Sequence, residues 1–455
     1  MAALPRGRTS SIELAALRET RERLAMKIAR LVGVHVAALT LLGCGSSSTS
    51  TETPAGTDGG PTAADAGRDA PTTGAGSDGG GSGPFAASAL TPETWTWIPV
   101  DGAICRDGSA TGIGVSVGTA TDKLMIYLEG GGACFNALTC GMNPTKYGKA
   151  DFTSAFVGAS ATHASAGIFN RGFAQNPVKD WTFVYVPYCT GDVHAGNFPD
   201  QTLAGVTGKQ QFVGYVNVGK DLQRIVPSFP GLTKVLLTGV SAGGFGAASN
   251  YVQVAQAFGS VPVYEIDDSG PPMPDPYNPK CLLTDQVNLW GFDKTILKDC
   301  GADCSDLGTF PLDFAKHVGK TYPNVPFGLI ESTDAGVITQ FFGFGANNCS
   351  VMVPMTVPAA TFTAGLTAVQ TALQGFPNFG SFIFGDPGAA NATQHTSLGG
   401  DTTFQSEDTG AVDTLLTAGD AGASPEAGAA DGGARIKLVD WVTQLVGGKT
   451  SNVGP

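Results

Sequence analysis

The 455-residue chain is poor in charge, with charged side chains at only 14% of its positions, and it has only five histidines. After residue 30 it has no stretch dense in lysine and arginine, and its formal net charge is −13. A nucleic-acid partner, which is held through its phosphates, is therefore not expected. Heptads, a fixed-period repeat and a second long apolar run are also missing, which excludes coiled coils, solenoids and polytopic membrane folds.

Residues 1–43 are predicted to be a signal peptide of the lipoprotein type. Its apolar run, 31–43, is too short to span a bilayer and follows basic residues. The run leads into Leu-Leu-Gly-Cys ending at Cys44, which resembles the lipobox of bacterial lipoproteins. Starting at Met26 would give a more usual leader length, so Met26 is the expected true start. An ordinary secretory signal with an incidental cysteine is the alternative.

These features predict an exported protein at the outer membrane or cell surface, held to the membrane by acyl chains on Cys44. Residues 44–90 are almost free of residues that a core could bury, so we expect a disordered linker there. Residues 91–455 are predicted to form one large domain with a disordered insertion near 405–434. We expect this domain to be monomeric.

Eight cysteines remain after Cys44, and an even number in an exported chain predicts up to four disulfides. The alternative is a zinc site. Cys300 and Cys304 have half of the required spacing, but no histidine or second cysteine pair lies near them in the sequence. Neither a metal nor an organic cofactor is expected.

Short apolar runs alternate with amphipathic patterns along the folded part. The runs predict buried strands at 123–130, 181–188, 234–240, 261–267, 325–332 and 380–386. The amphipathic patterns predict helices at 214–229, 242–259 and 434–448. Such alternation indicates an α/β fold, with a mostly parallel sheet covered by helices on both faces and its chemistry at the carboxyl ends of the strands.

The segment from Gly239 to Gly243, Gly-Val-Ser-Ala-Gly, has the GxSxG spacing of a nucleophile elbow. It lies between a predicted strand and a predicted helix, which is where this turn stands in α/β-hydrolase-like folds. The glycines remove side chains that would clash in the turn, and the turn presents the hydroxyl of Ser241 above the sheet. A glycine-rich turn without chemistry is the alternative.

A serine nucleophile needs a general base, and elbow-type hydrolases order their triad as serine, acid, histidine along the chain. That order leaves His317 and His395. His317 lies in an amphipathic helical pattern, where a surface histidine is the ordinary interpretation. His395 lies in a loop after the last predicted strand, and loops often carry catalytic groups. His395 is therefore the predicted base.

Several carboxylates follow predicted strands and could orient His395. Asp334 follows the strand before the histidine's own, which suits the elbow topology, and it is the first choice. Asp268 or its neighbour Asp267 follows the strand after the nucleophile, and Asp268 is the alternative. Asp386 is close to His395 in sequence and is better explained as a turn residue.

A glycine-rich loop, Glu129-Gly-Gly-Gly-Ala-Cys134, follows the strand at 123–130. Such a loop can direct backbone N–H groups at a developing oxyanion, as the HGGG loop of esterases does. The amides of Gly131 and Gly132 would act with that of Ala242, the residue after the nucleophile. Phosphate binding is disfavoured, because neither a following Lys-Ser/Thr pair nor GxGxxG is present.

In their order along 95–446, these segments resemble the pectin acetylesterase/Notum family of serine carboxylesterases. The resemblance rests on CRDGSATGIG, LEGGGACFN, YCTGDVHAGN, GVSAGG, ESTDAG, DTTF, LVDWVTQLV and the late histidine. It implies an α/β-hydrolase-like fold and the triad Ser241, Asp334 and His395. It also implies an oxyanion hole made by Gly131, Gly132 and Ala242, and the disulfides Cys105–Cys189 and Cys134–Cys140.

One departure from the family bears on the substrate. The family usually places tryptophan in the glycine loop, whereas Gly132 and Ala133 stand here, which widens the expected entrance. The segment around Asp192, His194 and Asn197 lies where the family approaches its substrate, and its polarity suits a sugar.

We therefore expect hydrolysis of acetyl esters on a polysaccharide such as pectin, with kcat/KM falling from acetyl to octanoyl esters. A lipase-like or protein-deacylating carboxylesterase is the alternative. In that case the phenylalanines 341, 342 and 344 would line an acyl tunnel rather than form a plain core stripe. A non-catalytic binding lipoprotein is the second alternative.

Overall fold

The computed structural model describes residues 81, 83–158, 163–333, 335–350, 353–385, 394–407, 414–415 and 436–454. The predicted signal peptide, Cys44, Asp334, Asp386 and most of the predicted insertion lie outside these ranges. Within them, no helix is long and apolar enough to cross a membrane. The fold begins somewhat before the predicted boundary at residue 91, because Phe85 packs edge-on against Phe229 at 5.5 Å between ring centroids.

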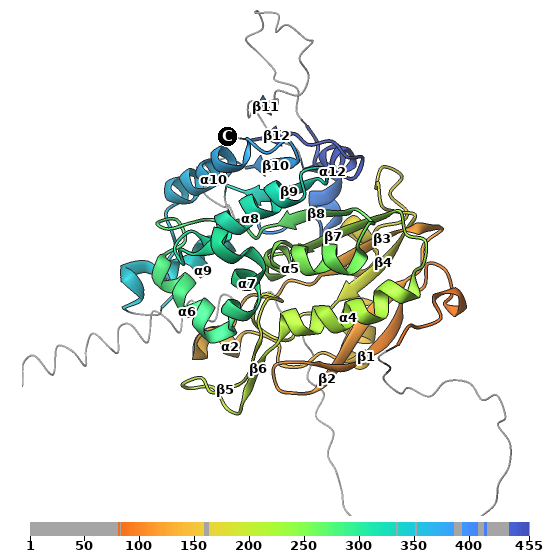
Figure 1. The fold of residues 1–455 in the computed structure, drawn as a ribbon, viewed down its shortest axis with the longest axis horizontal. Helices are drawn as coiled ribbons and strands as arrows, with labels where there is room; N and C mark the ends of the chain where they lie inside the picture. Colours follow the sequence, from red (N-terminus) through yellow and green to blue (C-terminus); the bar gives the residue numbers. More distant parts are fainter. Residues whose placement is uncertain are drawn as a thin grey trace, which may run out of the picture. The chain divides into compact units, whose positions relative to one another are not determined.

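A large mixed sheet forms the centre of the molecule (Figure 1). Its strands follow the order β1-β2-β4-β3-β7-β8-β9-β10-β12-β11. The pairs from β4 through β3, β7, β8, β9 and β10 to β12 are parallel, and antiparallel pairs stand at both edges. The strands span Thr96–Ile104 (β1), Ala110–Ser116 (β2), Ala120–Leu128 (β3), Trp181–Val186 (β4), Lys234–Val240 (β7), Val263–Asp268 (β8), Phe327–Ser332 (β9), Phe379–Phe384 (β10), Thr414–Leu415 (β11) and Asn452–Val453 (β12). All the predicted strands are confirmed, within a few residues at their ends.

Alternate residues of the central strands face two separate apolar clusters, because side chains in a strand point to opposite faces of the sheet. On one face, Ile126 and Leu237 pack with the helices α4, α5, α8 and α10. On the other, Met125 and Leu236 pack with α12. The predicted arrangement of helices on both faces of a mostly parallel sheet is therefore confirmed.

The three predicted helices are confirmed as α4, α5 and α12. The helices that matter below are α4 (Gly214–Ser228), α5 (Ala242–Phe258), α6 (Lys280–Trp290), α7 (Ile296–Cys300), α8 (Phe310–Thr321), α9 (Gly336–Gly343), α10 (Ala359–Leu373) and α12 (Leu438–Val446). Shorter ones are α2 (Ala137–Gly141), α3 (Lys149–Asp151) and α11 (Asp401–Ser406), and a small separate hairpin joins β5 (Phe198–Gln201) to β6 (Gln210–Phe212).

Four disulfides join all eight cysteines that follow Cys44: Cys105–Cys189, Cys134–Cys140, Cys281–Cys349 and Cys300–Cys304. The first two are the pairs that the family resemblance implied. Cys300 and Cys304 bond to each other, so they are not half of a zinc site. This many disulfides is typical of an exported protein.

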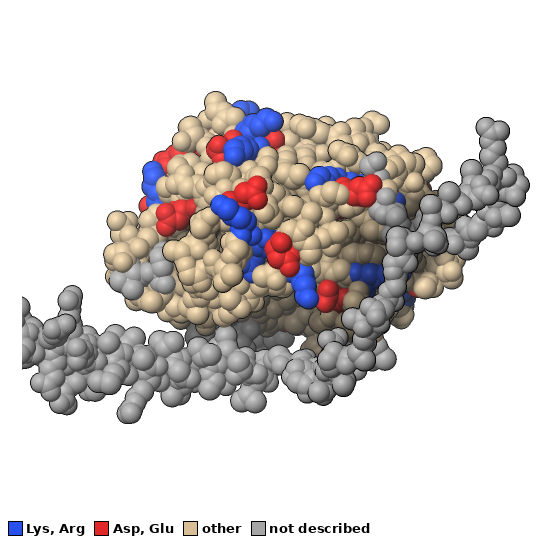
Figure 2. All heavy atoms as spheres, turned by 90° about the horizontal axis from the view of Figure 1, so that it is seen from below, with Lys and Arg blue, Asp and Glu red and all other residues tan. Residues whose placement is uncertain are grey.

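Charged side chains are sparse on the face that Figure 2 shows, and basic and acidic groups lie next to one another there. Surface ion pairs among the described residues, on this face or elsewhere, include Lys280–Asp306 and Lys179–Asp180. On this face, lysine and arginine do not gather into a patch.

Candidate active site

Ser241 stands at the turn between β7 and α5, with φ 57° and ψ −121°. A left-handed φ is unusual for a residue with a side chain, and it is a strain typical of a nucleophile elbow. The glycine two residues on is required by close approach, because a Cβ on Gly243 would lie 1.9 Å from the carbonyl oxygen of Leu128. The GxSxG segment therefore forms the predicted elbow.

The glycine-rich loop after β3 runs beside this turn. A Cβ on Gly130 would lie 3.1 Å from the Cβ of Ser241. The structure thus brings together the loop and the serine that the sequence predicted as oxyanion hole and nucleophile.

Two side chains hold carbonyl oxygens of the loop. Asn143 Nδ2 donates to the carbonyl of Gly131 at 2.6 Å, and the hydroxyl of Tyr188 donates to the carbonyl of Gly132 at 2.9 Å. The Tyr188 hydroxyl also accepts a hydrogen bond from the amide of Val193 at 2.9 Å. These contacts fix the orientation of the peptide groups in the loop.

A third carbonyl is held by a buried histidine. Nε2 of His194 lies 2.8 Å from the carbonyl oxygen of Glu129, so this nitrogen must carry the proton. Burial lowers the pKa of His194 to about 4, and the ring is therefore neutral at ordinary pH. Burial raises the pKa of Glu129 to about 7, against hydrogen bonds to its carboxylate from Tyr185 and the Tyr188 amide.

With their carbonyls held in this way, the N–H groups of the loop remain available. The amides of Gly131, Gly132 and Ala242 make no hydrogen bond to any residue that the structure describes. Free backbone donors beside a serine are what an oxyanion hole requires.

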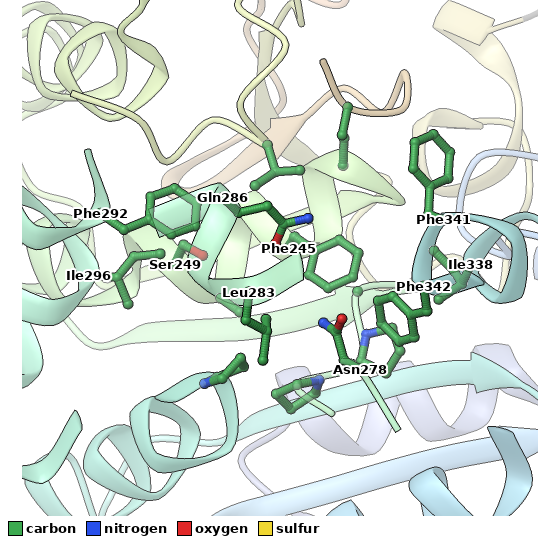
Figure 3. Close-up of a pocket in the computed structure, with 18 of the residues that line it drawn as sticks. Phe245, Ser249, Asn278, Leu283, Gln286, Phe292, Ile296, Ile338, Phe341 and Phe342 are labelled. Atoms are coloured by element: carbon green, nitrogen blue, oxygen red, sulfur yellow. The ribbon is translucent and has the colours of Figure 1, made fainter. Parts of the chain in front are cut away.

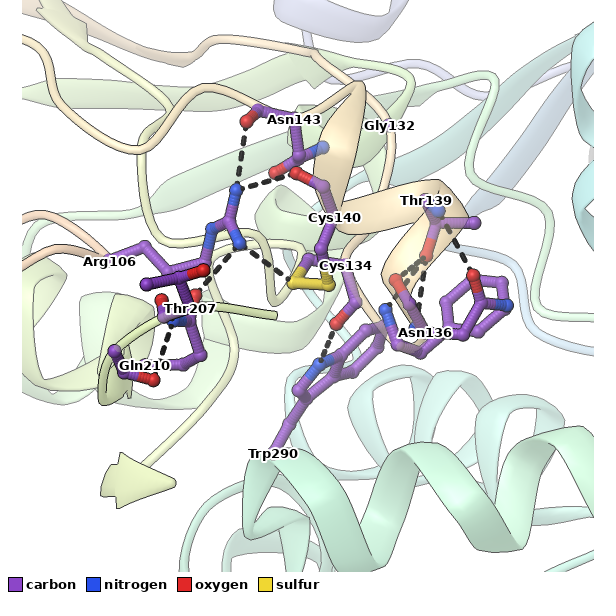
Figure 4. The surroundings of a disulfide bond; sticks show 12 residues. Arg106, Gly132, Cys134, Asn136, Thr139, Cys140, Asn143, Thr207, Gln210 and Trp290 are labelled. Carbon is purple, nitrogen blue, oxygen red and sulfur yellow. Dashed lines mark hydrogen bonds between the residues drawn. A yellow bond between two sulfur atoms is a disulfide. The ribbon is translucent and has the colours of Figure 1, made fainter. Parts of the chain in front are cut away.

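The loop continues into the Cys134–Cys140 disulfide, which is braced by a buried arginine (Figure 4). The carbonyl oxygens of Cys140 and Asn143, at the second half of the disulfide and just after it, accept hydrogen bonds from Nη2 of Arg106 at 2.9 and 2.8 Å. Trp290 Nε1 donates to the carbonyl of Cys134 at 3.0 Å. The disulfide and Arg106 therefore position Asn143, which in turn holds the oxyanion loop.

His395 lies in a loop that is attached to the end of β8. Oδ2 of Asp268 accepts hydrogen bonds from the amides of Ser397 and Leu398 at 2.7 and 2.6 Å. The hydroxyl of Ser269 donates to Oδ1 of Asp268 at 2.8 Å. Because the backbone carbonyl of Asp268 also accepts from the amide of Ser241 at 2.7 Å, one residue connects the elbow with the histidine loop.

The same contacts bear on which carboxylate orients the histidine. Both oxygens of Asp268 are occupied by Ser269 and by two backbone amides, and no hydrogen bond joins Asp268 to the ring of His395. Nδ1 of His395 is buried without a hydrogen-bond partner among the described residues, and burial lowers the pKa of the ring to about 4. Asp334, the first choice from sequence, lies outside the described residues.

His317, the other candidate base, lies on α8 as predicted. Its Nδ1 is 2.9 Å from Oδ2 of Asp303 in a pair at the surface. This is the ordinary structural role that the sequence pattern indicated. Asp267 is buried beneath the first turn of α5, close to Gly244.

Ser241 lines a pocket of about 110 Å³, called here the acyl pocket (Figure 3). Its walls come from the glycine-rich loop, α5, the segment after β8, α6 and the stretch that follows it, α7, α8 and α9, and they are mostly apolar. They include Phe245, Leu283, Phe292, Ile296, Phe310, Phe314, Ile338, Phe341 and Phe342. Gln286, Asn278 and Ser249 are the polar side chains that Figure 3 labels in this lining.

The phenylalanines 341 and 342 line this pocket, as the alternative interpretation of their segment required, whereas Phe344 packs against Phe135 at 5.1 Å. The entrance is not simply widened at Gly132. A Cβ there would lie 3.2 Å from Cζ of Phe341, so the ring of Phe341 occupies the space beside the loop.

The expectation that Asp192 and His194 approach a sugar is wrong, because both are buried and used internally. The carboxylate of Asp192 accepts from the Thr190 hydroxyl at 2.6 Å and from the Gly214 amide at 2.8 Å. Neither residue is part of the acyl pocket lining. The polar groups of Asp192 and His194 form hydrogen bonds that join the loops beneath the active site.

The fold and the strained elbow define an α/β-hydrolase-like protein, and comparison with known proteins narrows the class. The sequence profile of the pectinacetylesterase family matches residues 94–298. Over this range, which is somewhat less than half of its length, the chain is similar to the pectin acetylesterase/Notum family. The matched range includes the elbow and the oxyanion loop, whereas Asp334 and His395 lie beyond it.

Relatives with similar sequences are palmitoleoyl-protein carboxylesterases. Notum2 of Xenopus laevis is 31% identical over 154 residues, which cover 33% of this chain and 30% of that protein. NOTUM of Mus musculus is 27% identical over 175 residues, or 36% and 33% of the two chains. The match thus spans about a third of these relatives' length. A solved structure of the Wnt deacylase Notum from Drosophila superposes with a TM-score of 0.44 at 18% identity, covering 64% of this chain and 85% of that one.

Sequence reasoning missed the residues that hold the oxyanion loop, namely Asn143, Tyr188 and His194, as well as the role of Asp268 as a connector. No local pattern marks them, because each acts on a segment far away in the chain. For Asp268 the available signal was a charged residue at a buried position, and for His194 it was a histidine in an apolar setting. Asn143 and Tyr188 carried no such signal.

Proposed function

We propose that this protein is a serine carboxylesterase in which Ser241 is the nucleophile, His395 the base and Asp334 the orienting acid. The observation that carries the proposal is the strained elbow at Ser241, which stands beside free loop amides at the wall of an apolar pocket. His395 takes the proton from the Ser241 hydroxyl as its oxygen attacks the ester carbonyl carbon. The amides of Gly131, Gly132 and Ala242 stabilise the oxyanion.

The tetrahedral intermediate then collapses. The alcohol leaves with the proton that His395 holds, and the acyl group remains on Ser241 as an ester. Water, deprotonated by His395, attacks this acyl-enzyme and releases the carboxylic acid and the free serine. Nδ1 of His395 is buried without a partner among the described residues, and both carboxylate oxygens of Asp268 already accept other hydrogen bonds, which supports Asp334 as the partner of His395.

The apolar lining supports a substrate with an acyl chain longer than acetyl. Burying each methylene is worth about 0.8 kcal/mol, so a chain that fills this lining gains affinity with length. The relatives' names, palmitoleoyl-protein carboxylesterases, favour the same direction. We therefore propose the alternative that the sequence left open, a carboxylesterase for longer acyl chains, over the acetyl esterase that the sequence favoured.

The test is hydrolysis of p-nitrophenyl esters from acetyl to dodecanoyl by the wild type and by Ser241→Ala. We expect kcat/KM to rise with chain length and the variant to lose nearly all activity. Equal rates for the two proteins would refute a serine mechanism and favour a non-catalytic binding protein. A fall in kcat/KM from acetyl to octanoyl would restore the acetyl esterase, with acetylated pectin as the next substrate to try.

The chain is further proposed to be exported and anchored by lipid on Cys44. The leader pattern before Cys44 supports this, as do the disulfides of the folded part, which form in oxidising compartments. An anchored hydrolase of this kind would act on substrates at or outside the cell surface.

A further inference from the structure

A second, smaller cavity of about 50 Å³ lies on the same face of the sheet as the acyl pocket. We call it the distal chamber. Its polar lining is Tyr251 of α5 with Glu265 and Asp267 of β8, which point to the same face because they are two residues apart in a strand. Apolar side chains of α8, β9 and α10 complete it, among them Val318, Leu329 and Leu373.

The three polar side chains of the chamber are nearly inaccessible to solvent, with exposed fractions of 1% for Tyr251, 3% for Glu265 and 4% for Asp267. An atom of each, respectively Oη, Oε1 and Oδ1, has no hydrogen-bond partner among the described residues. Native proteins rarely leave buried polar atoms unpaired, so three such side chains in the lining of one cavity indicate a site that receives something polar.

The chamber and the acyl pocket share parts of their walls. Ala248, Pro272, Pro311 and Phe314 line both cavities. An acyl chain attached to Ser241 that extends along α5 therefore meets these shared side chains, with the chamber beyond them. Figure 3 shows the acyl pocket enclosed by rings and aliphatic side chains, which favour the methylene part of such a chain.

We propose that the distal chamber binds a hydroxyl group carried by the acyl chain of the substrate, which makes the enzyme selective for hydroxylated acyl esters. This rests on the proposed function. A hydroxyl both donates and accepts hydrogen bonds, and so it pairs with the Tyr251 hydroxyl and a neutral carboxyl group.

The charge state of the chamber favours a neutral guest. Burial, and the neighbouring acids next, raise the pKa of both Glu265 and Asp267 well above the usual range. Among the residues that the structure describes, no lysine, arginine or histidine lines the chamber. Carboxyl groups whose neutral form is favoured by an apolar enclosure match an alcohol, whereas a carboxylate at the chain end would find no cation to pair with in this lining.

The experiment compares p-nitrophenyl esters of unsubstituted acids with their ω-hydroxy counterparts, from butanoyl to dodecanoyl. In the wild type we expect one range of chain lengths at which the hydroxyl raises kcat/KM. In Tyr251→Phe and Glu265→Gln, kcat/KM for the hydroxy ester of that length should fall roughly 3- to 10-fold, as expected for the loss of one hydrogen bond. The kcat/KM for the unsubstituted ester should change little. Tyr322→Phe is the matched control, because its ring packs on Tyr251 at 5.1 Å outside the chamber lining.

Binding to Ser241→Ala decides the same point without turnover. Calorimetry should show tighter binding of the ω-hydroxy acid than of the unsubstituted acid, and adding Tyr251→Phe should remove the difference. If the hydroxyl lowers affinity at every length, or the variants treat both series alike, the chamber holds water only and the proposal fails. If the folded wild type hydrolyses none of these esters but the binding preference for the ω-hydroxy acid is present, the proposed esterase function fails and the hydroxyl site remains.

Discussion

The carboxylate of Asp268 lies 2.6 Å from the amide nitrogen of Leu398 and thereby joins the end of β8 to the loop that carries His395. The same residue accepts the amide of Ser241 on its carbonyl oxygen. Nucleophile and base are thus positioned from one point of the sheet. These hydrogen bonds account for the burial of the Asp268 carboxylate without making it a member of the triad. In this interpretation Asp268 positions the two reacting side chains and takes no part in proton transfer.

Asp268→Asn should keep most of the activity. The amide oxygen can still accept from the amides of Ser397 and Leu398, while its NH₂ group can donate to the hydroxyl of Ser269. Asp268→Ala removes these bonds and should lower kcat roughly 100-fold by loosening the histidine loop. Steady-state kinetics of the two variants measure this. A loss with asparagine as large as that with alanine would make Asp268 the triad acid.

Asp334→Asn should lower kcat by about 10⁴, as removal of the triad carboxylate does in other serine hydrolases. It should also shift the acid limb of the kcat/KM profile to lower pH. A carboxylate favours the imidazolium and raises the pKa of His395, whereas burial alone lowers it to about 4, so removing the carboxylate lets burial prevail. An unmoved limb in Asp334→Asn, beside a moved one in Asp268→Asn, would reverse the assignment.

Tyr188→Phe should lower kcat roughly 10- to 100-fold with little change in KM, because the Gly132 peptide loses the hydroxyl that fixes it. Affinity for a trifluoromethyl ketone, which forms an oxyanion on the serine, should fall in parallel. Tyr147→Phe is the control, since its hydroxyl lies 3.3 Å from that of Tyr185. Equal effects of the two changes would mean that Tyr188 supports the fold in general.

The two short-range disulfides give a matched pair of variants. Cys134→Ser with Cys140→Ser should cost about 2 kcal/mol of stability from loop closure, and so should Cys300→Ser with Cys304→Ser. The first pair should also lower kcat, because its bridge supports the turn that carries Asn143 and the Gly131 carbonyl. Thermal unfolding and kinetics separate the two effects. A kcat that survives loss of Cys134–Cys140 would show that Arg106 braces the loop unaided.

Cys44→Ser should release the protein from membranes into the soluble exported fraction, because a serine at this position cannot carry the thioether-linked lipid. Fractionation of cells with an antibody to the folded domain measures it. Unchanged membrane association in the variant would refute anchoring at Cys44.

Sequence by itself determined the alternation of strands and helices, because buried strands need apolar runs and covering helices need an amphipathic repeat. It also determined the elbow at Ser241 and the oxyanion loop, since close backbone approach leaves only glycine at their crowded positions. These features are local, and a pattern of a few residues contains them. The assignment of His395 and Asp334 to a triad remains a prediction.

Only the tertiary structure decided what surrounds that serine. The carbonyls of the loop are held by Asn143, Tyr188 and His194, and the acyl pocket is assembled from α5, α6, α7, α8 and α9 with the segment after β8. Polar residues that looked suited to a sugar, such as Asp192, turned inward, since hydrogen bonds inside the fold replaced those to water. Such roles depend on which distant segments meet, and burial and hydrogen-bond pairing are set only when the chain has folded.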